Sequence, residues 1–307
     1  MSSPLIFDMR KTGNLAETLV QAVNGEMGEM CRRHFPDGES YIRLESTVKD
    51  RDVIFTVDLS QPDAKMVPLL FAANTACSLG AKTLGLVAPY LPYMRQDKAF
   101  KTGEAVSARY FAQLLSSAFD WMVTVDPHLH RVQTLKSLYL LDPITVSSMP
   151  AIVDWVKNHT SDPLIIGPDS ESLQWVSSVA KTLVAPYVVA RKKRNGDHSV
   201  QIDMPNLGKF QDYTPIILDD IISTGTTLIK TVEALGPFGL APPVCLTVHA
   251  LMQEEVESKL LKVGVTQIIS TNSVPHKTNK IDISDLISQA AAQYLKAPHA
   301  ASLRRLV

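Results

Sequence analysis

The segment IILDDIISTGTTL, residues 216–228, determines how the rest of the chain is interpreted. It joins an apolar run, two adjacent carboxylates, a loop of small residues and the start of an amphipathic run. Successive backbone N–H groups of such a loop, together with a helix N-terminus, form a concave donor site for phosphate. Asp219 and Asp220, at the end of a buried strand, can meet vicinal hydroxyls or a magnesium ion. The segment therefore predicts a sugar-phosphate site, and a capped helix beside solvated acids is the simpler alternative.

Runs typical of strands alternate with runs typical of helices on both sides of this segment. We expect strands at 52–57, 83–88, 121–125, 143–146, 163–166, 185–190, 214–218, 244–248 and 266–270. Amphipathic spacing predicts helices at 66–79 and 107–117 and after residue 227. This alternation is typical of βαβ units around a parallel sheet, and the almost continuous apolar strands indicate sheets covered on both faces.

The two halves of the chain repeat one pattern. VIFTVD at 53–58 leads through LSQPDAK into a helix, and PIILDD at 215–220 leads through IISTGTT into another. We interpret the repeat as two similar α/β domains, residues 1–146 and 147–307, whose last residues could pack back on the first domain. The alternative is that all βαβ units look alike at this level of patterning.

The composition narrows the class of protein. The 307 residues suffice for two domains, and 30 basic against 31 acidic residues leave a net charge of −1. We therefore expect neither nucleic acid nor a membrane as partner. The cysteines Cys31, Cys77 and Cys245 lack metal-ligand spacing, and we expect them to be buried small apolar residues. This cysteine usage, and the lack of an apolar run of about 18 residues, predict a cytoplasmic protein.

Two segments of the first half carry candidate nucleotide contacts. In HFPDGE, residues 34–39, a turn would present Phe35 as a stacking platform. In YMRQDK, residues 93–98, Arg95 offers a planar fork for phosphate and Gln96 an amide. A plain β-turn is the commoner meaning of Pro-Asp-Gly, so only the joint occurrence of the two segments favours a nucleotide site.

Three further segments place polar groups after apolar runs. TVDPHLHR (124–131) contains His128, IIGPDSES (165–172) contains Asp169, and RKKRNGDH (191–198) forms a basic arm. A lone histidine at a strand end is usually structural, and a charge run is usually a solvated face. Magnesium needs few protein ligands beside phosphate oxygens and water, so one imidazole and one carboxylate would suffice.

These motifs together resemble a known family. Residues 216–228 resemble the phosphoribosyl pyrophosphate (PRPP) loop of type I phosphoribosyltransferase folds. HFPDGE and YMRQDK resemble the ATP-binding segments of ribose-phosphate pyrophosphokinases, which ordinary phosphoribosyltransferases lack. The resemblance extends from Phe35 to TNS at 271–273. It implies an α/β protein of two similar phosphoribosyltransferase-type domains, each a mainly parallel sheet flanked by helices, the first binding ATP and the second ribose 5-phosphate.

The resemblance also implies a reaction and its residues. Pyrophosphate would pass from ATP to the C1 hydroxyl of ribose 5-phosphate, giving PRPP and AMP, with Mg²⁺ as cofactor and a homo-oligomer, dimer or hexamer, as the assembly. The implied ATP contacts are Phe35, Asp37, Gly38, Glu39, Arg95, Gln96 and Asp97. The implied ribose-5-phosphate contacts are Asp219, Asp220, Ser223, Thr224, Gly225, Thr226 and Thr227. His128 and Asp169 would position the metal, and Lys192 and Arg194, matching a K-x-R pair in a mobile loop of the family, would be catalytic.

Several positions depart from the common family pattern. The phosphate loop is usually DTAGT or DTGGT, whereas Ser223 replaces its acid and Thr226 stands at a usual glycine. The metal segment is DPH instead of DLH, and KAFKTGEAVS at 98–107 replaces a more arginine-rich stretch. These departures favour a divergent branch of the family. A non-catalytic regulatory relative and a PRPP-dependent phosphoribosyltransferase are the alternatives; the first tends to lose catalytic residues that are present here, and the second would leave the first domain without a role.

Overall fold

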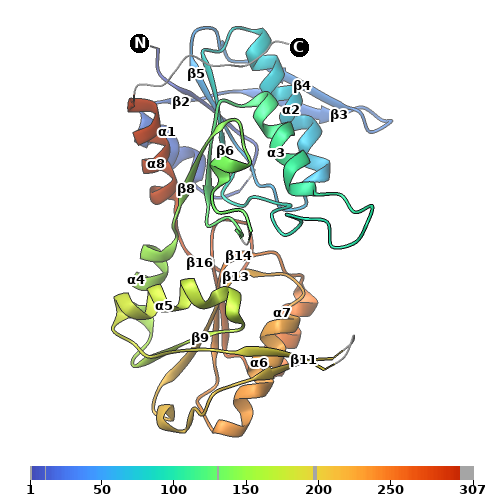
Figure 1. Ribbon diagram of the computed structural model, residues 1–307. Helices are drawn as coiled ribbons and strands as arrows, with labels where there is room; N and C mark the ends of the chain where they lie inside the picture. The colour runs from blue at the N-terminus through green and yellow to red at the C-terminus, as the bar shows by residue number, and fades with distance from the viewer. Residues whose placement is uncertain (1, 11, 130, 196–198, 298–307) are drawn as a thin grey trace. The chain divides into compact units, whose positions relative to one another are not determined.

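The computed structural model describes residues 2–10, 12–129, 131–195 and 199–297, with the side chains of 192–201 outside the description. The chain divides into two compact units, each described here by itself (Figure 1). Unit 1 comprises Met1–Ser147 and Ser284–Val307, and unit 2 comprises Ser148–Ile283.

Unit 1 is built on a six-stranded parallel sheet with the order β2-β1-β5-β6-β7-β8. Its strands are β1 (Leu5–Asp8), β2 (Glu26–Met27), β5 (Asp52–Thr56), β6 (Thr83–Val87), β7 (Trp121–Val125) and β8 (Asp142–Val146). The central strands are buried on both faces because their apolar runs are continuous. On one face Phe7 stacks on Phe55, with ring centroids 5.4 Å apart.

Two pairs of helices cover the two faces of this sheet (Figure 1). On the Phe55 face lie α2 (Asp63–Ser78) and α3 (Ser107–Ala118), and on the other lie α1 (Leu15–Val23) and α8 (Ser284–Lys296). The C-terminal helix is held there by Tyr294, whose ring centroid lies 4.9 Å from that of Trp121. Gly85 makes room for this indole, because a Cβ at Gly85 would lie 2.1 Å from Trp121 Cζ2.

Unit 2 repeats the design with a six-stranded parallel sheet of the order β10-β9-β13-β14-β15-β16. Its strands are β9 (Pro163–Gly167), β10 (Tyr187–Val189), β13 (Thr214–Ile222), β14 (Val244–Ala250), β15 (Gln267–Thr271) and β16 (Asn279–Ile281). Its helices are α4 (Met149–His159), α5 (Leu173–Leu183), α6 (Thr226–Leu235) and α7 (Glu254–Lys262). Leu228, Val232 and Leu235 of α6 pack with Leu260 of α7 on one face of the sheet.

The two units share their topology element by element. In each sheet the second strand of the unit lies at one edge, beside the first, and the later strands follow in chain order. Each unit also inserts an antiparallel hairpin between its second and third sheet strands: β3 (Met30–His34) with β4 (Ser40–Leu44), and β11 (Arg191–Asn195) with β12 (Ser199–Asp203). The predicted fold, two similar α/β domains with mainly parallel sheets, is confirmed, so the sequence repeat reflects a shared architecture.

Three details differ from expectation or extend it. The strand expected at 214–218 continues to Ile222, because pairing with β14 persists beyond Asp219, so the two carboxylates lie inside β13. The three cysteines are free thiols, but only Cys245 is fully buried, while Cys31 and Cys77 are partly exposed. None of the described helices combines the length and apolar character that a bilayer crossing requires.

Candidate active site

Three carboxylates meet at one edge of the unit 2 sheet. Strands β9 and β13 are parallel neighbours, so their carboxyl ends lie at the same edge. Asp169 follows β9, and Asp219 and Asp220 lie in the last half of β13. Burial, together with the charges of Asp220 and Asp169, raises the pKa of the Asp219 carboxyl well above its usual value. The site therefore favours any ligand that brings a cation or hydrogen-bond donors to these carboxylates.

The backbone around Asp169 fixes the position of its carboxylate. Asp169 is only 8% exposed, and its Oδ1 accepts a hydrogen bond from the backbone N–H of Glu171, at 3.0 Å. The hydroxyl of Ser172 donates to the Asp169 carbonyl at 2.6 Å, which closes the turn. Because a Cβ at Gly167 would lie 2.3 Å from Ser172 Oγ, glycine at this strand end makes the turn possible.

The predicted phosphate loop connects β13 to α6. Gly225 precedes the first helical residue and has a φ of +68°, a conformation that favours glycine. Thr226 is already the first residue of α6, and its hydroxyl donates to Thr224 Oγ1 at 3.2 Å. The conformational freedom that this loop requires is thus supplied by Gly225, so threonine at position 226 is compatible with it. The N-terminus of α6 presents backbone N–H groups beside these hydroxyls, a donor set suited to phosphate.

The basic arm is a β-hairpin. Residues 191–195 form β11, which pairs antiparallel with β12, where a mobile loop was expected. Lys192 pairs with Ile202 and Arg194 with Val200 in this register. The side chains of Lys192 and Arg194 lie outside the part of the chain that the structure describes, as do residues 196–198 entirely.

The TNS segment at 271–273 begins at the last residue of β15, and its buried hydroxyls form hydrogen bonds within unit 2. Thr271 and Ser273 are fully buried, and their hydroxyls both donate to the Val248 carbonyl, at 2.7 and 2.8 Å. Ser273 Oγ also lies 2.9 Å from Nδ1 of the buried His249. This network joins the ends of β14 and β15 at the same edge of the sheet as the carboxylates.

In unit 1, the predicted turn of HFPDGE forms the tip of the β3–β4 hairpin. The N–H of Gly38, which has a φ of +92°, donates to the Phe35 carbonyl at 2.9 Å. The N–H of Phe35 donates to the Glu39 carbonyl at 2.8 Å, and Asp37 Oδ1 accepts from the Glu39 N–H at 3.2 Å. The turn predicted from the sequence is therefore present, and it holds the two carboxylates at the exposed tip.

Phe35 is part of an aromatic and cationic cluster on this hairpin. It is 40% exposed and packs edge-on against Tyr41, with ring centroids 6.0 Å apart. The Arg33 guanidinium lies 4.6 Å from the centroid of Phe35 and 4.3 Å from that of Tyr41. These contacts hold an exposed aromatic ring in one orientation, as a stacking platform requires.

An ion pair brings the two other unit 1 segments together. Arg131 Nη1 lies 2.9 Å from Asp97 Oδ1, and the Arg131 N–H donates to Asp97 Oδ2 at 3.3 Å. The Asp97 side chain is 2% exposed, so its contacts fix the segment that carries the exposed Arg95 and Gln96. The sequence reasoning assigned no role to Arg131, although it is the last residue of the quoted 124–131 segment.

His128 follows a constrained strand end. Asp126, at the end of β7, has a φ of +38° and is almost fully buried, and its N–H donates to the Val146 carbonyl at 3.0 Å. A non-glycine residue held at positive φ costs about 1–3 kcal/mol and often marks a functional site. The strained residue sets the direction in which the chain continues to His128.

The donor chemistry of the carboxylate site fits magnesium. Mg²⁺ prefers oxygen ligands and usually keeps phosphate oxygens and water beside one or two carboxylates. Within the ranges that the structure describes, no three acidic, histidine or cysteine side chains form a group able to hold a metal ion by themselves. The two predicted metal residues belong to different units, His128 to unit 1 and Asp169 to unit 2.

Comparison with family models matches both units separately. Residues 4–118 match the N-terminal domain of ribose phosphate pyrophosphokinase, and residues 149–282 match the phosphoribosyl transferase domain. The first match covers the unit 1 strands up to β6, and the second covers the whole unit 2 sheet, so each unit has its own family counterpart.

Relatives that match nearly the whole chain are ribose-phosphate pyrophosphokinases. A ribose-phosphate pyrophosphokinase of Sulfurisphaera tokodaii is 30% identical over 288 residues, covering 92% of this chain and 97% of the relative. One of Saccharolobus solfataricus is 32% identical over 288 residues, covering 92% and 96%. The solved structure of phosphoribosylpyrophosphate synthetase from Mycobacterium smegmatis has a TM-score of 0.84 at 22% identity, covering 96% of this chain and 100% of that one. This last similarity establishes the shared fold along nearly the whole chain.

Proposed function

The chain belongs to the ribose-phosphate pyrophosphokinase family, and from this membership we infer that it converts ATP and ribose 5-phosphate to PRPP and AMP. The C1 hydroxyl oxygen of the sugar forms a bond to the β-phosphorus, and the bond from that phosphorus to the oxygen bridging the α-phosphate breaks. AMP leaves, and the hydroxyl proton passes to solvent. The observation that carries this conclusion is the separate match of unit 1, since a transferase that only consumes PRPP needs no such domain.

We propose that unit 2 binds ribose 5-phosphate. Asp219 and Asp220 would accept hydrogen bonds from the ribose hydroxyls, and these donors would offset the burial that raises the pKa of the Asp219 carboxyl. The 5-phosphate would lie at the N-terminus of α6, held by the loop residues Ser223, Thr224, Gly225, Thr226 and Thr227.

We propose that unit 1 binds ATP. Phe35 would stack on the adenine, with Asp37, Gly38 and Glu39 beside it at the hairpin tip. Arg95 and Gln96 are exposed and would contact the nucleotide directly. Asp97 would act by holding Arg131 and thus the whole 93–98 segment, because its carboxylate is buried in that ion pair.

We propose Mg²⁺ as the cofactor, with His128 and Asp169 among its ligands. When bound to the triphosphate, magnesium neutralises phosphate charge and orients the reacting groups. Lys192 and Arg194 would stabilise the negative charge that accumulates on the transferring group, since phosphoryl-type transfer depends on positioning and charge neutralisation. We further propose a cytoplasmic homo-oligomer, a dimer or hexamer, that binds neither nucleic acid nor membranes, in keeping with its net charge of −1.

The test is a direct assay. Purified protein incubated with Mg²⁺, ATP and ribose 5-phosphate should form AMP and PRPP in equal amounts, and omission of ribose 5-phosphate should abolish both. AMP without PRPP would indicate ATP hydrolysis. Formation of neither product would favour a non-catalytic relative, and PRPP consumption with release of pyrophosphate in the presence of a nucleobase would favour a phosphoribosyltransferase.

A further inference from the structure

Tyr93 begins the 93–98 segment in a backbone conformation that is rare for a residue of its size. Its φ is +64°, in the left-handed region that bulky side chains avoid. On either side of it, Leu91 and Met94 are 2% exposed and belong to the unit 1 core. The next two residues, Arg95 and Gln96, are exposed. A conformation of this cost persists only where the surrounding structure holds it, so the contacts of Tyr93 determine how the two exposed residues are presented.

Three contacts hold Tyr93, one at each part of the residue. Its hydroxyl donates to Oδ1 of Asp63, the first residue of α2. Its ring packs against that of Phe111 on α3, with ring centroids 5.0 Å apart. Its carbonyl accepts a hydrogen bond from the N–H of Gln96 at 3.0 Å, which closes a turn. The segment is therefore tied to both helices that cover this face of the sheet.

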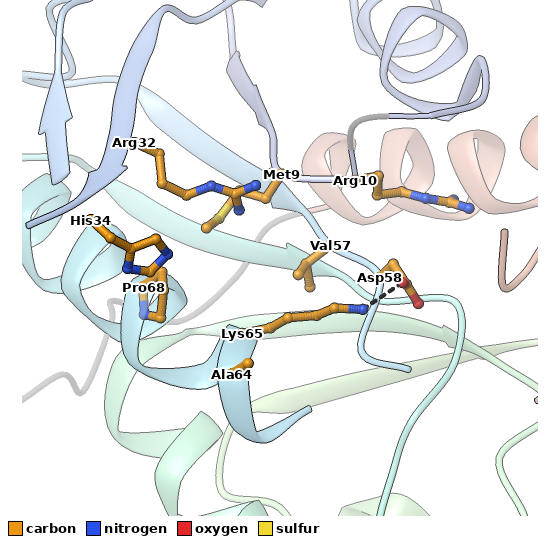
Figure 2. Close-up of a pocket in the computed structure, with 9 residues that line it drawn as sticks. All are labelled: Met9, Arg10, Arg32, His34, Val57, Asp58, Ala64, Lys65 and Pro68. Atoms are coloured by element: carbon orange, nitrogen blue, oxygen red, sulfur yellow. Dashed lines mark hydrogen bonds and ion pairs between the residues drawn. The ribbon is translucent and has the colours of Figure 1, made fainter. Parts of the chain in front are cut away.

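The acceptor for the Tyr93 hydroxyl lies on a helix turn that is itself held in place. Lys65 Nζ, two residues after Asp63, lies 2.6 Å from Asp58 Oδ2 in the loop that follows β5. Figure 2 shows this ion pair, whose two residues line a pocket of about 340 Å³. The Ser60 N–H and hydroxyl also donate to Asp58, at 2.9 and 2.8 Å. The first turn of α2 is thus fixed to the end of the sheet, and the Asp63 carboxylate with it.

The hydrogen bond between Tyr93 and Asp63 also determines the protonation of the phenol. Chiefly through this bond, and also through partial burial, the pKa of Tyr93 is raised to about 12. The hydroxyl therefore stays protonated near neutral pH and remains a donor to the carboxylate.

The segment is anchored on both sides of its exposed residues. Before them lies the contact of Tyr93 with α2, and after them Asp97 Oδ1 lies 2.9 Å from Arg131 Nη1. Between these anchors, the Gln96 carbonyl accepts a hydrogen bond from the N–H of Ala108, at the start of α3, at 3.3 Å. Loss of the Tyr93 hydroxyl would release only the first anchor, so we expect the change to stay within this segment.

We propose that Tyr93 is a positioning residue for nucleotide binding: through its hydrogen bond to Asp63 it holds Arg95 and Gln96 in the arrangement that receives ATP. The inference rests on the ATP site proposed for unit 1 and extends it to a pair of residues that act without touching the nucleotide. A merely structural role would lower stability and leave the affinity for ATP unchanged.

The test measures binding to the full-length protein, so it does not depend on turnover. Calorimetry gives the affinities for ATP with Mg²⁺ and, separately, for ribose 5-phosphate. Tyr93→Phe removes only the hydroxyl and should weaken ATP binding about fivefold or more, with ribose-5-phosphate binding near wild type. In hydrogen–deuterium exchange, the 93–98 peptide of the free variant should exchange faster than that of the wild type. Tyr110→Phe is the matched control, because it makes the same chemical change at a residue of α3 that is 55% exposed.

Variants of Asp63 test whether the pair acts as a unit. Asp63→Ala should weaken ATP binding as much as Tyr93→Phe does. The double variant should bind ATP no more weakly than either single variant, because one hydrogen bond cannot be lost twice. Asp63→Asn keeps an acceptor oxygen and should retain most of the affinity.

The outcomes separate this inference from the proposed reaction. An unchanged ATP affinity in Tyr93→Phe, additive losses in the double variant, or equal losses for ATP and ribose 5-phosphate would refute the positioning role. At saturating ATP, Tyr93→Phe should form PRPP with a kcat near that of the wild type and a raised KM for ATP alone. A wild-type protein that binds ATP without forming PRPP would contradict the proposed reaction, and the affinities of the variants would still decide the role of Tyr93.

Discussion

Replacing Gly225 by alanine should damage both the stability of unit 2 and its phosphate loop. Gly225 has a φ of +68°, and an added Cβ would lie 2.6 Å from Val256 Cγ1 of α7. The left-handed conformation costs a non-glycine residue about 1–2 kcal/mol. Overpacking of this kind adds about 1–3 kcal/mol, so Gly225→Ala should lose about 2–5 kcal/mol in total.

Matched variants separate the two contributions. Gly239 also has a positive φ, +64°, but a Cβ there would meet nothing within 4 Å. Gly239→Ala should therefore lose only the stability that the left-handed backbone conformation costs a non-glycine residue. In the Val256→Ala background, Gly225→Ala should lose only the backbone part. The assay is the unfolding midpoint by calorimetry, in which each kcal/mol corresponds to roughly 2–4 °C. Gly225→Ala should therefore lower Tm by about 4 °C or more.

The same variant should weaken sugar-phosphate binding. If the loop moves, its N–H groups no longer converge on the 5-phosphate, and a hydrogen bond to a charged group contributes about 1.5–3 kcal/mol. The KM for ribose 5-phosphate should rise about tenfold or more, while the KM for ATP and the kinetics of Gly239→Ala stay near wild type. A Gly225→Ala variant no less stable than Gly239→Ala, or with an unchanged KM for ribose 5-phosphate, would refute the assignment of this loop.

Three further predictions concern other parts of the molecule. Folding raises the pKa of Asp219, so ionisation of this carboxyl destabilises the folded state increasingly as pH rises from the unfolded to the folded pKa. Asp219→Asn should therefore raise Tm above that of the wild type by more at about pH 8 than at about pH 4. An equal Tm difference at both pH values would contradict this reasoning. Lys192→Ala should lower kcat about 100-fold or more with little change in the KM for ATP, whereas the exposed Lys262→Ala should match wild type; unchanged turnover would remove Lys192 from the mechanism. Gly85→Ala should destabilise unit 1 by about 1–3 kcal/mol or more by displacing Trp121, a loss visible in thermal unfolding and absent from Gly236→Ala, where the added methyl meets open space.

The regular elements followed from the sequence because their causes are local. The strand at 121–125 and the strand start at 214 agree with the structure, since continuous apolar runs fix where a doubly covered strand begins. The end of β13 was placed too early. Asp219 and Asp220 interrupt the apolar pattern, but pairing with β14 carries the strand on to Ile222, and that pairing depends on a strand that comes later in the chain.

The candidate site was recognisable in its parts but not in its contacts. The turn at the tip of the first hairpin follows from Pro-Asp-Gly, whose backbone preferences are local. The ion pair between Asp97 and Arg131 joins residues 34 positions apart in the chain, and nothing in either segment indicates the other. The structure adds that the Asp97 carboxylate is buried against Arg131, and the predicted contact of Asp97 with ATP stays a prediction.

The family, the alternating order of strands and helices, and the loop types that can hold a phosphate all follow from residue types at short spacing, so they could be predicted before the fold was known. Which charges converge depends instead on how the chain folds. The effect of Asp169 on Asp219 depends on the parallel pairing of β9 and β13, which brings their carboxyl ends to one edge of the sheet. Electrostatic interactions act through space, so one-dimensional spacing cannot reveal them until the fold has set the distances.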